Sequence, residues 1–311
     1  MDIQKVAPEL RPYYQYLPAI PFHNRFLQFL MRFSLGLIGR RHHMKGVQVE
    51  RIRIGPFGLR IYQPDQGTCG AGLLWVHGGG FMMGSAAQDD GICSAFARRL
   101  GLVVVSVDYR LAPEHPFPAA LDDCFAAWKW LLGAADDLGV DPARIAIGGM
   151  SAGGGLAASL AQKILDSARR QPAAQLLMYP MLDDRTAADH SLDEIKHYLW
   201  NNHNNRAGWS AYLGQEPGQP DVPDYAAAAR RAELSGLPPA RIGVGDIDLF
   251  YDENRVYAER LNAAGVACEL DLVPMAPHGF QVVAPRAAVS RVFNERNFDF
   301  LIRILRLERD R

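Results

Sequence analysis

The sequence of 311 residues has few cysteines, no excess of charge of either sign and no apolar run long enough to cross a bilayer. Its 33 Lys and Arg residues nearly balance 34 Asp and Glu residues, so there is no electrostatic reason to expect a nucleic-acid partner. The cysteines form neither a C-x-x-C pair nor a metal-ligand spacing: they are Cys69, Cys93, Cys124 and Cys268. We therefore expect reduced thiols in a cytoplasmic protein that binds no metal.

The most apolar stretch, "FLQFLMRFSLGLIG" at 26–39, lies near the N-terminus. A membrane-spanning helix needs about 20 apolar residues, and this shorter stretch contains Arg32 and follows Arg25. It also lacks the basic start and the small-residue cleavage site of a signal peptide. We expect no integral membrane segment here, but an amphipathic helix that packs on the protein or, as the alternative, touches a membrane surface.

Predicted strands alternate with predicted helices along most of the chain. A β hairpin is predicted over 46–64, and further strands over 72–76, 102–107, 144–149, 175–180, 240–246 and 268–274. Helices are predicted over 89–100, 119–139, 152–168 and 251–265, and after Pro285. This alternation predicts an α/β fold with a mostly parallel central sheet flanked by helices.

Two segments interrupt the alternation. From 183 to about 237 no strand pattern is visible, and the segment is rich in Asn, His, Trp, Tyr and Pro. We expect a catalytic domain over 47–311 with a cap insertion at about 183–237, and an N-terminal helical cap segment over 1–46. Both caps carry apolar side chains, so they are expected to pack together as a lid over the carboxyl ends of the strands, where open α/β sheets bind ligands.

One serine lies among five glycines in "GGMSAGGG", 148–155, between a predicted strand and a predicted helix. The stretch is either a structural turn that happens to hold Ser151, or a strained elbow that presents it as a nucleophile in the spacing G-x-S-x-G. A serine nucleophile needs a base and a group that orients the base. His278 follows the last predicted strand, and the carboxylates on the preceding loop are Asp246, Asp248 and Asp252.

Acyl transfer also needs N–H groups directed at the developing oxyanion. Gly78, Gly79 and Gly80 stand in a row directly after the strand at 72–76, in "WVHGGGFMMGS". The residue after the nucleophile, Ala152, offers a further N–H from the start of its helix. The sequence thus supplies both parts of a serine acyl-transfer site, and the order serine, aspartate, histidine is that of α/β-hydrolase triads.

Five blocks together resemble the hormone-sensitive-lipase-like family of α/β-hydrolase carboxylesterases: "HGGG" at 77–80, "DYRLAPEHPFPAALDD" at 108–123, "GMSAGG" at 149–154, "DLFYDE" at 248–253 and "HGF" at 278–280. The resemblance implies an α/β-hydrolase fold with a helical cap. It also implies hydrolysis of short-to-medium acyl esters through an acyl-enzyme, with no cofactor, and a homodimer as in many relatives.

The same resemblance assigns roles to individual residues. Ser151 becomes the nucleophile, His278 the base and Asp248 the acid. The oxyanion donors are Gly79, Gly80 and Ala152. The substrate pocket is expected to draw on Phe81, Met82, Met150, Trp200, Trp209 and Tyr212, although packing within the cap explains the last three equally well.

The sequence departs from the family at two places. Met150 stands where many relatives have Asp or Thr, which leaves the subfamily open. Asp248-Leu249-Phe250 stands where many have Asp-Pro-Leu. Asp246 is the alternative acid, and an N-cap role at the following helix is the alternative for Asp248. An amidase or a lipase of the same fold, or a ligand-binding relative without activity, are the alternatives in function.

Overall fold

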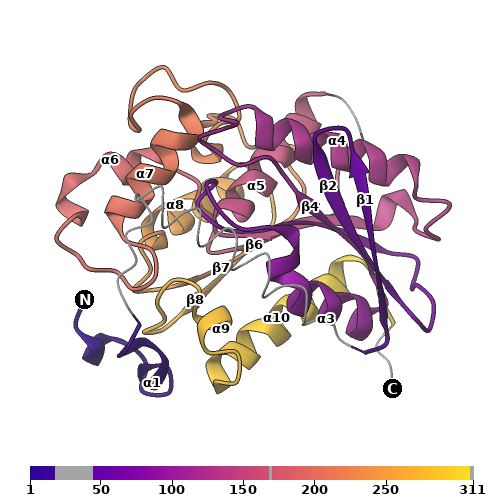
Figure 1. The fold of residues 1–311 in the computed structure, drawn as a ribbon, viewed down its shortest axis with the longest axis horizontal. Coiled ribbons are helices and arrows are strands. Elements are labelled where there is room, and N and C mark those ends of the chain that lie inside the picture. The colour runs from indigo at the N-terminus through magenta and orange to yellow at the C-terminus, as the bar shows by residue number, and fades with distance from the viewer. Residues whose placement is uncertain (18–44, 168–169, 309–311) are drawn as a thin grey trace.

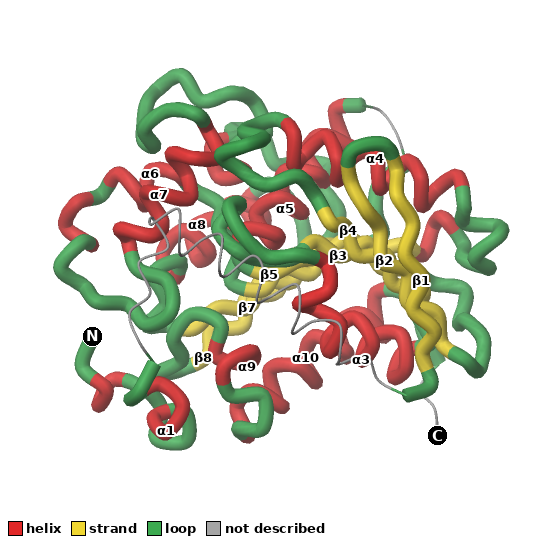
Figure 2. Tube along the Cα trace, in the orientation of Figure 1, coloured by secondary structure: helices red, strands yellow, loops and turns green. Residues whose placement is uncertain are grey.

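A computed structural model describes residues 1–17, 45–167 and 170–308 of the chain. In these residues the central sheet has eight strands in the order β1-β2-β4-β3-β5-β6-β7-β8. β1 and β2 pair antiparallel, β2 is antiparallel to β4, and the pairs from β4 to β8 are parallel. Figure 2 shows the strands as one twisted band with helices on both sides. The strands are β1 (Val47–Ile54), β2 (Phe57–Pro64), β3 (Gly72–Val76), β4 (Val103–Asp108), β5 (Ile145–Met150), β6 (Gln175–Met178), β7 (Ala240–Gly245) and β8 (Cys268–Val273). The predicted mostly parallel α/β sheet is confirmed.

Helices cover both faces of the sheet (Figure 1). The residues of α4 (Ala119–Gly133), α5 (Ala152–Asp166) and α8 (Tyr251–Ala263) pack in one buried cluster, and those of α3 (Asp90–Leu100) and α10 (Ala288–Ile304) in another. The shorter helices are η1 (Ile3–Lys5), α1 (Arg11–Tyr14), η3 (Ala86–Asp89), η4 (Pro142–Arg144), α6 (Asp184–Ala188), η5 (His190–Leu192), α7 (Asn202–Leu213), η6 (Ala228–Arg230) and α9 (Phe280–Val283).

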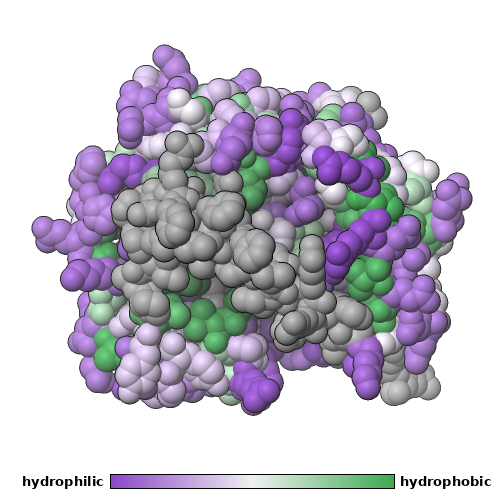
Figure 3. Space-filling view, viewed as in Figure 1, coloured by the Kyte–Doolittle hydropathy of each residue, from purple (hydrophilic) through white to green (hydrophobic). Residues whose placement is uncertain are grey.

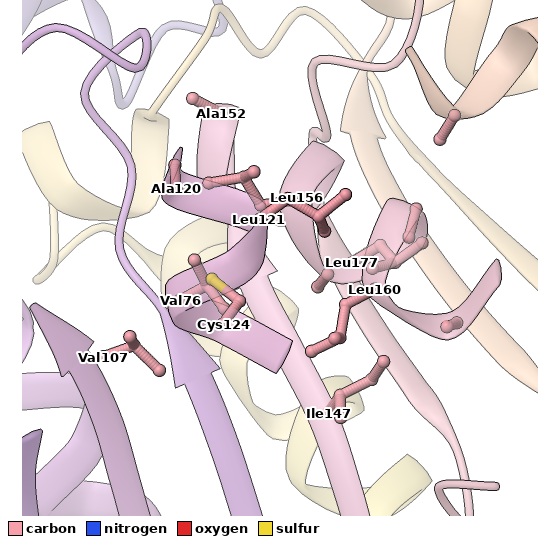
Figure 4. Packing of buried hydrophobic residues seen from close by; sticks show 14 of the residues in the cluster. Val76, Val107, Ala120, Leu121, Cys124, Ile147, Ala152, Leu156, Leu160 and Leu177 are labelled. Carbon is pink, nitrogen blue, oxygen red and sulfur yellow. The ribbon is translucent and has the colours of Figure 1, made fainter. Parts of the chain in front are cut away.

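Strand β3 shows why the apolar runs become buried strands. Its side chains alternate between the faces, so Leu74 and Val76 join the cluster under α4 and α5, whereas Leu73 and Trp75 join the one under α3 and α10. A strand covered on both faces needs apolar residues at every position. Figure 4 shows side chains of α4 and α5 packed with Val76 and other strand residues.

The predicted cap insertion contains no strand in the structure, but α6, η5, α7 and η6. The residue just before it is bound to the body by Glu253 of α8, whose Oε1 accepts a 2.7 Å hydrogen bond from the Leu182 N–H. Within it, buried Asp184 accepts 2.6 and 2.8 Å hydrogen bonds from Arg230 and a 2.6 Å bond from the Gly218 N–H. These buried charge-assisted bonds fix the start of the insertion to its end.

Of two predicted helices, one is shorter in the structure and the other lies outside the described residues. The helix predicted over 119–139 ends earlier, at Gly133, because the chain then turns: the Val140 N–H bonds to the Ala135 carbonyl and Gly139 has a φ of 66°. The amphipathic helix predicted at 26–39 lies outside the described residues.

The described surface mixes polar and apolar groups. On the face shown in Figure 3, hydrophobic groups lie in patches between hydrophilic side chains. In residues 1–17, 45–167 and 170–308, no helix combines the length and the apolar character that a membrane span requires.

Candidate active site

Ser151 occupies a sharp turn between β5 and α5. Its φ of 55° and ψ of −125° lie in a region that non-glycine residues rarely adopt, so surrounding contacts must hold it there. Its N–H bonds to the Met178 carbonyl at 2.9 Å, and its carbonyl accepts bonds of 3.0 Å from the Gly155 and Met181 N–H groups. The strained turn is therefore fixed by β6 and by the first turn of α5.

The glycines around Ser151 are required by close approach. A Cβ on Gly153 would lie 2.2 Å from the Val76 carbonyl oxygen, and one on Gly155 would lie 2.0 Å from the Met181 carbonyl oxygen. A Cβ on Gly149 would lie 2.5 Å from the Gly153 carbonyl oxygen. No side chain fits at such distances, so the glycine cluster allows the elbow to pack against the end of β3 and the loop after β6.

The structure brings Ser151, His278 and Asp248 together. His278 Nε2 lies 3.0 Å from Ser151 Oγ, and His278 Nδ1 lies 2.8 Å from Asp248 Oδ2. The side chain of His278 is 6% exposed and that of Asp248 is fully buried. The second oxygen of Asp248 accepts a 2.9 Å bond from the Phe250 N–H. One carboxylate thus orients the histidine and caps its own turn at the same time.

The alternative acid lies elsewhere. Asp246 is exposed, and its Oδ1 accepts a 2.6 Å bond from the Met275 N–H. Asp252 is exposed as well, 3.5 Å from Arg255. Of Asp246, Asp248 and Asp252, which lies in α8, Asp248 is the one that contacts His278.

The loop that carries His278 is held by aromatic residues from distant parts of the chain. The hydroxyl of buried Tyr14 donates a 3.0 Å bond to the His278 carbonyl. The rings of Tyr179 and Phe250 meet the imidazole edge to face, with centroids 4.7 and 5.2 Å away. No local sequence pattern links Tyr14 or Tyr179 to the histidine, so neither residue is predicted from the sequence.

The glycine loop after β3 touches the elbow. A Cβ on Gly78 would lie 3.4 Å from the Cβ of Ser151. Gly79 and Gly80 have φ values of 128° and 59°, which favour glycine. Among the described residues, the N–H groups of Gly79, Gly80 and Ala152 donate no hydrogen bond.

His77 packs beneath the glycine loop. It is fully buried, and its Nδ1 lies 2.8 Å from the Gly78 carbonyl oxygen. Its ring stacks on Tyr109 at 4.2 Å, and the Tyr109 hydroxyl donates to its carbonyl at 3.0 Å. Burial lowers the pKa of His77, which favours the neutral imidazole. These contacts hold the loop in place.

Three of the residues expected in the substrate pocket pack on one another. The ring of Phe81 stacks on Tyr212 with centroids 4.1 Å apart and meets Trp209 at 5.1 Å. All three are almost fully buried and belong to the cluster that includes α4 and α5. They therefore join the insertion to the glycine stretch as core side chains.

The other three make separate contacts. The indole of Trp200 rests against Gly80, because a Cβ there would be 2.1 Å from Trp200 Cη2. Met82 is buried in the same cluster as Trp200. Met150 belongs to the opposite cluster and lines a cleft beside α3. No set of three or more His, Cys, Asp or Glu side chains in the described residues is grouped so as to hold a metal ion.

Comparison with known proteins identifies relatives of this chain. The alpha/beta hydrolase fold family matches residues 73–282. Carboxylesterase NlhH of Mycobacterium tuberculosis is 41% identical over 256 residues, which cover 78% of this chain and 79% of that protein. Ethyl acetate hydrolase of Pseudomonas putida is 34% identical over 233 residues, 71% of this chain and 70% of that protein.

Solved structures agree as well. A bacterial heroin esterase matches with a TM-score of 0.90 and 37% identity, over 97% of this chain and 99% of that one. The described fold, the serine elbow and these relatives identify the chain as a member of the hormone-sensitive-lipase-like family of α/β-hydrolase carboxylesterases, and as a carboxylic-ester hydrolase.

Proposed function

We propose that the chain hydrolyses carboxylic esters through an acyl-enzyme formed on Ser151, with His278 as the base and Asp248 as the acid. The observation that carries this proposal is the hydrogen-bonded series from Asp248 through His278 to Ser151, with distances of 2.8 and 3.0 Å. Serine is a weak nucleophile without such a base, and this series supplies one with a buried partner.

In the first half of the reaction, Ser151 Oγ attacks the ester carbonyl carbon while its proton passes to His278 Nε2. The carbonyl oxygen becomes an oxyanion that accepts hydrogen bonds from the N–H groups of Gly79, Gly80 and Ala152. Asp248 accepts the Nδ1–H and stabilises the charged imidazole. The C–O bond to the alcohol then breaks, and the alcohol leaves with the proton from Nε2.

In the second half, water replaces the alcohol. His278 Nε2 takes a proton from this water as its oxygen attacks the acyl carbon, and the same N–H groups bind the oxyanion. The bond to Ser151 Oγ breaks, the proton returns to Oγ, and the carboxylic acid is released. The enzyme is restored without a cofactor.

We also propose that 1–46 and the insertion at about 183–237 form a cap that limits the acyl group to short and medium lengths. Support comes from contacts on both sides of the site: Trp200 lies against Gly80, and a Cβ on Gly279 would be 2.7 Å from Leu199. The N-terminal amine donates a 2.8 Å bond to the Lys196 carbonyl, so the first residues meet this insertion. The name of the related ethyl acetate hydrolase refers to a short acyl ester, which agrees with such a limit.

An acyl-chain series of nitrophenyl esters, from acetate to palmitate, tests the proposal. We expect kcat/KM to be highest for short and medium chains and to be lost in Ser151→Ala. The matching anilides test amidase activity, and a triolein emulsion tests lipase activity. A faster reaction with either of these than with the soluble esters would overturn the proposed substrate class.

The cap has its own test. Trp200→Ala removes the indole over Gly80 and should move the preferred acyl length upward. Leu213→Ala, at the end of α7, is the matched control and should keep the wild-type profile. If both variants fold and share that profile, the cap does not set the acyl length.

Two sequence-based expectations stay predictions. The four cysteines are free thiols, which suits a cytoplasmic protein, and cell fractionation would test that location. A homodimer is tested by light scattering at several protein concentrations.

A further inference from the structure

A cleft of ≈ 450 Å³ opens beside the residue that precedes the nucleophile. It lies between α3 on one side and α9 with α10 on the other, and its apolar wall includes Ile92, Ala95 and Met150. Sites for small molecules in proteins commonly measure roughly 300–1,000 Å³, so the cleft can hold part of a substrate.

The cleft, named here the Met150 cleft, is lined by the residue that directly precedes the nucleophile in the chain. Consecutive Cα atoms are about 3.8 Å apart, so Met150 lies next to the nucleophile. Gln88 also lines the cleft, and its Nε2 donates a 3.1 Å bond to the Gly78 carbonyl. A Cβ on Gly78 would lie 3.4 Å from the Cβ of Ser151, so Met150 and Gln88 connect the cleft wall to the elbow and to the glycine loop.

Two buried acceptors stand at the cleft. Gln281, which is 6% exposed, donates through Nε2 to the Tyr179 hydroxyl, and its Oε1 has no hydrogen-bond partner among the described residues. Asn294 Oδ1 is likewise buried without a described partner. Both side chains line the cleft. A buried acceptor without a donor is unfavourable, so these oxygens favour a ligand that brings a hydroxyl or N–H group.

The charges around the cleft nearly cancel. Arg99 and Glu295 at the rim form a two-bond ion pair of 2.6 and 2.7 Å. Arg291 is exposed and donates a 3.0 Å bond to a carbonyl. Asp89 accepts a 2.7 Å bond from Trp75, and burial raises the pKa of this carboxyl to about 7. Because Arg99 and Glu295 pair with each other and Asp89 is bonded to Trp75, the cleft suits a neutral donor better than an ion.

We propose that the Met150 cleft binds one arm of the ester substrate, an apolar chain with a hydroxyl group that donates to Gln281 Oε1 or Asn294 Oδ1. The substrates are then esters of hydroxylated acids or of diols. This inference rests on the proposed function, because the arm must belong to an ester that reacts at Ser151.

A blocking variant tests where the arm binds. Ala95→Trp fills the cleft from α3, and Arg98→Trp, exposed on the same helix and outside the cleft, is the matched control. The substrates are methyl 6-hydroxyhexanoate, 6-hydroxyhexyl acetate and methyl acetate. Methyl acetate has no hydroxyl group, and neither of its arms is long enough to fill the cleft. We expect Ala95→Trp to raise KM at least tenfold for one of the two long substrates and to change methyl acetate less than twofold.

The long substrate that is affected shows whether the acyl or the alcohol arm enters the cleft. Unchanged KM values for both long substrates in folded Ala95→Trp, or equal effects of Arg98→Trp, would overturn the site. Methyl acetate separates the two proposals, because a wild-type protein that hydrolyses none of the three esters contradicts the proposed function itself.

A second pair of variants tests the hydroxyl group. Wild type should prefer the hydroxylated ester to its hydroxyl-free counterpart, methyl hexanoate or hexyl acetate, by about tenfold in kcat/KM, as expected for one hydrogen bond. Asn294→Leu or Gln281→Leu should reduce this preference to near unity, and Asn294→Leu should leave the hydroxyl-free ester unchanged. A preference that is absent from wild type, or that survives both substitutions, would refute the hydroxyl assignment.

Discussion

Replacing Asp248 by Asn tests the proposed role of this carboxylate in orienting His278. The carboxylate accepts two bonds, one from His278 Nδ1–H at 2.8 Å and one from the Phe250 N–H at 2.9 Å. Asn has one acceptor oxygen. If it serves the Phe250 N–H, the amide NH₂ faces the imidazole, which must then accept at Nδ1 and carry its proton on Nε2. A protonated Nε2 cannot take the proton of Ser151.

The expected loss follows from this tautomer change. The alternative amide orientation would place an NH₂ group against the Phe250 N–H, so the backbone bond favours the inactive arrangement. For a buried aspartate in this role, the loss of kcat is on the order of 10⁴. At about 1.36 kcal/mol per tenfold change, this corresponds to about 5.5 kcal/mol of transition-state stabilisation.

Initial rates with nitrophenyl acetate, after circular dichroism has shown that the variants are folded, measure the effect. Asp246→Asn is the matched control two residues away. Its amide oxygen still accepts from the Met275 N–H, so kcat should stay within about threefold, as for an ordinary exposed substitution. An Asp248→Asn enzyme within tenfold of wild type, or an Asp246→Asn enzyme with the larger loss, would refute the assignment.

Three further predictions follow from the same structure. Ser151→Ala should lose on the order of 10⁶ in kcat at unchanged melting temperature, and ester turnover within tenfold of wild type would contradict the mechanism. Tyr14→Phe removes the donor to the His278 carbonyl and should lower kcat by about tenfold at unchanged KM, whereas Tyr13→Phe, 41% exposed, should change neither; equal behaviour of the two would remove this role. Asp89, whose pKa burial raises from 3.8 to about 7, stabilises the fold when protonated, and this stability is lost as pH rises through 7. Denaturant titrations from pH 5 to 8.5 should therefore show that the free energy of unfolding of Asp89→Asn rises relative to that of wild type by a few kcal/mol, about 1.4 kcal/mol per pH unit below that pKa. Parallel curves of unfolding free energy against pH for the two proteins would contradict the raised pKa.

The sequence by itself determined the α/β alternation, the family and the position of the serine elbow. These features depend on neighbours in the chain: apolar runs that suit a strand buried on both faces, and glycines where the backbone must turn closely. The elbow shows this most clearly, because Gly149, Gly153 and Gly155 each face a carbonyl that leaves no room for a Cβ. The local sequence pattern therefore predicts most of the strands and helices of the fold.

Only the tertiary structure decided whether Asp248 or Asp246 contacts His278, because two carboxylates on one loop cannot be told apart without the conformation of the turn. It also placed Trp209 and Tyr212 against Phe81 in the core, and brought Tyr14 to the histidine loop across 264 positions of sequence. Such contacts arise from how distant segments pack. No periodicity or motif in one stretch of the chain predicts these contacts, because the second residue of each contact lies far away in the sequence.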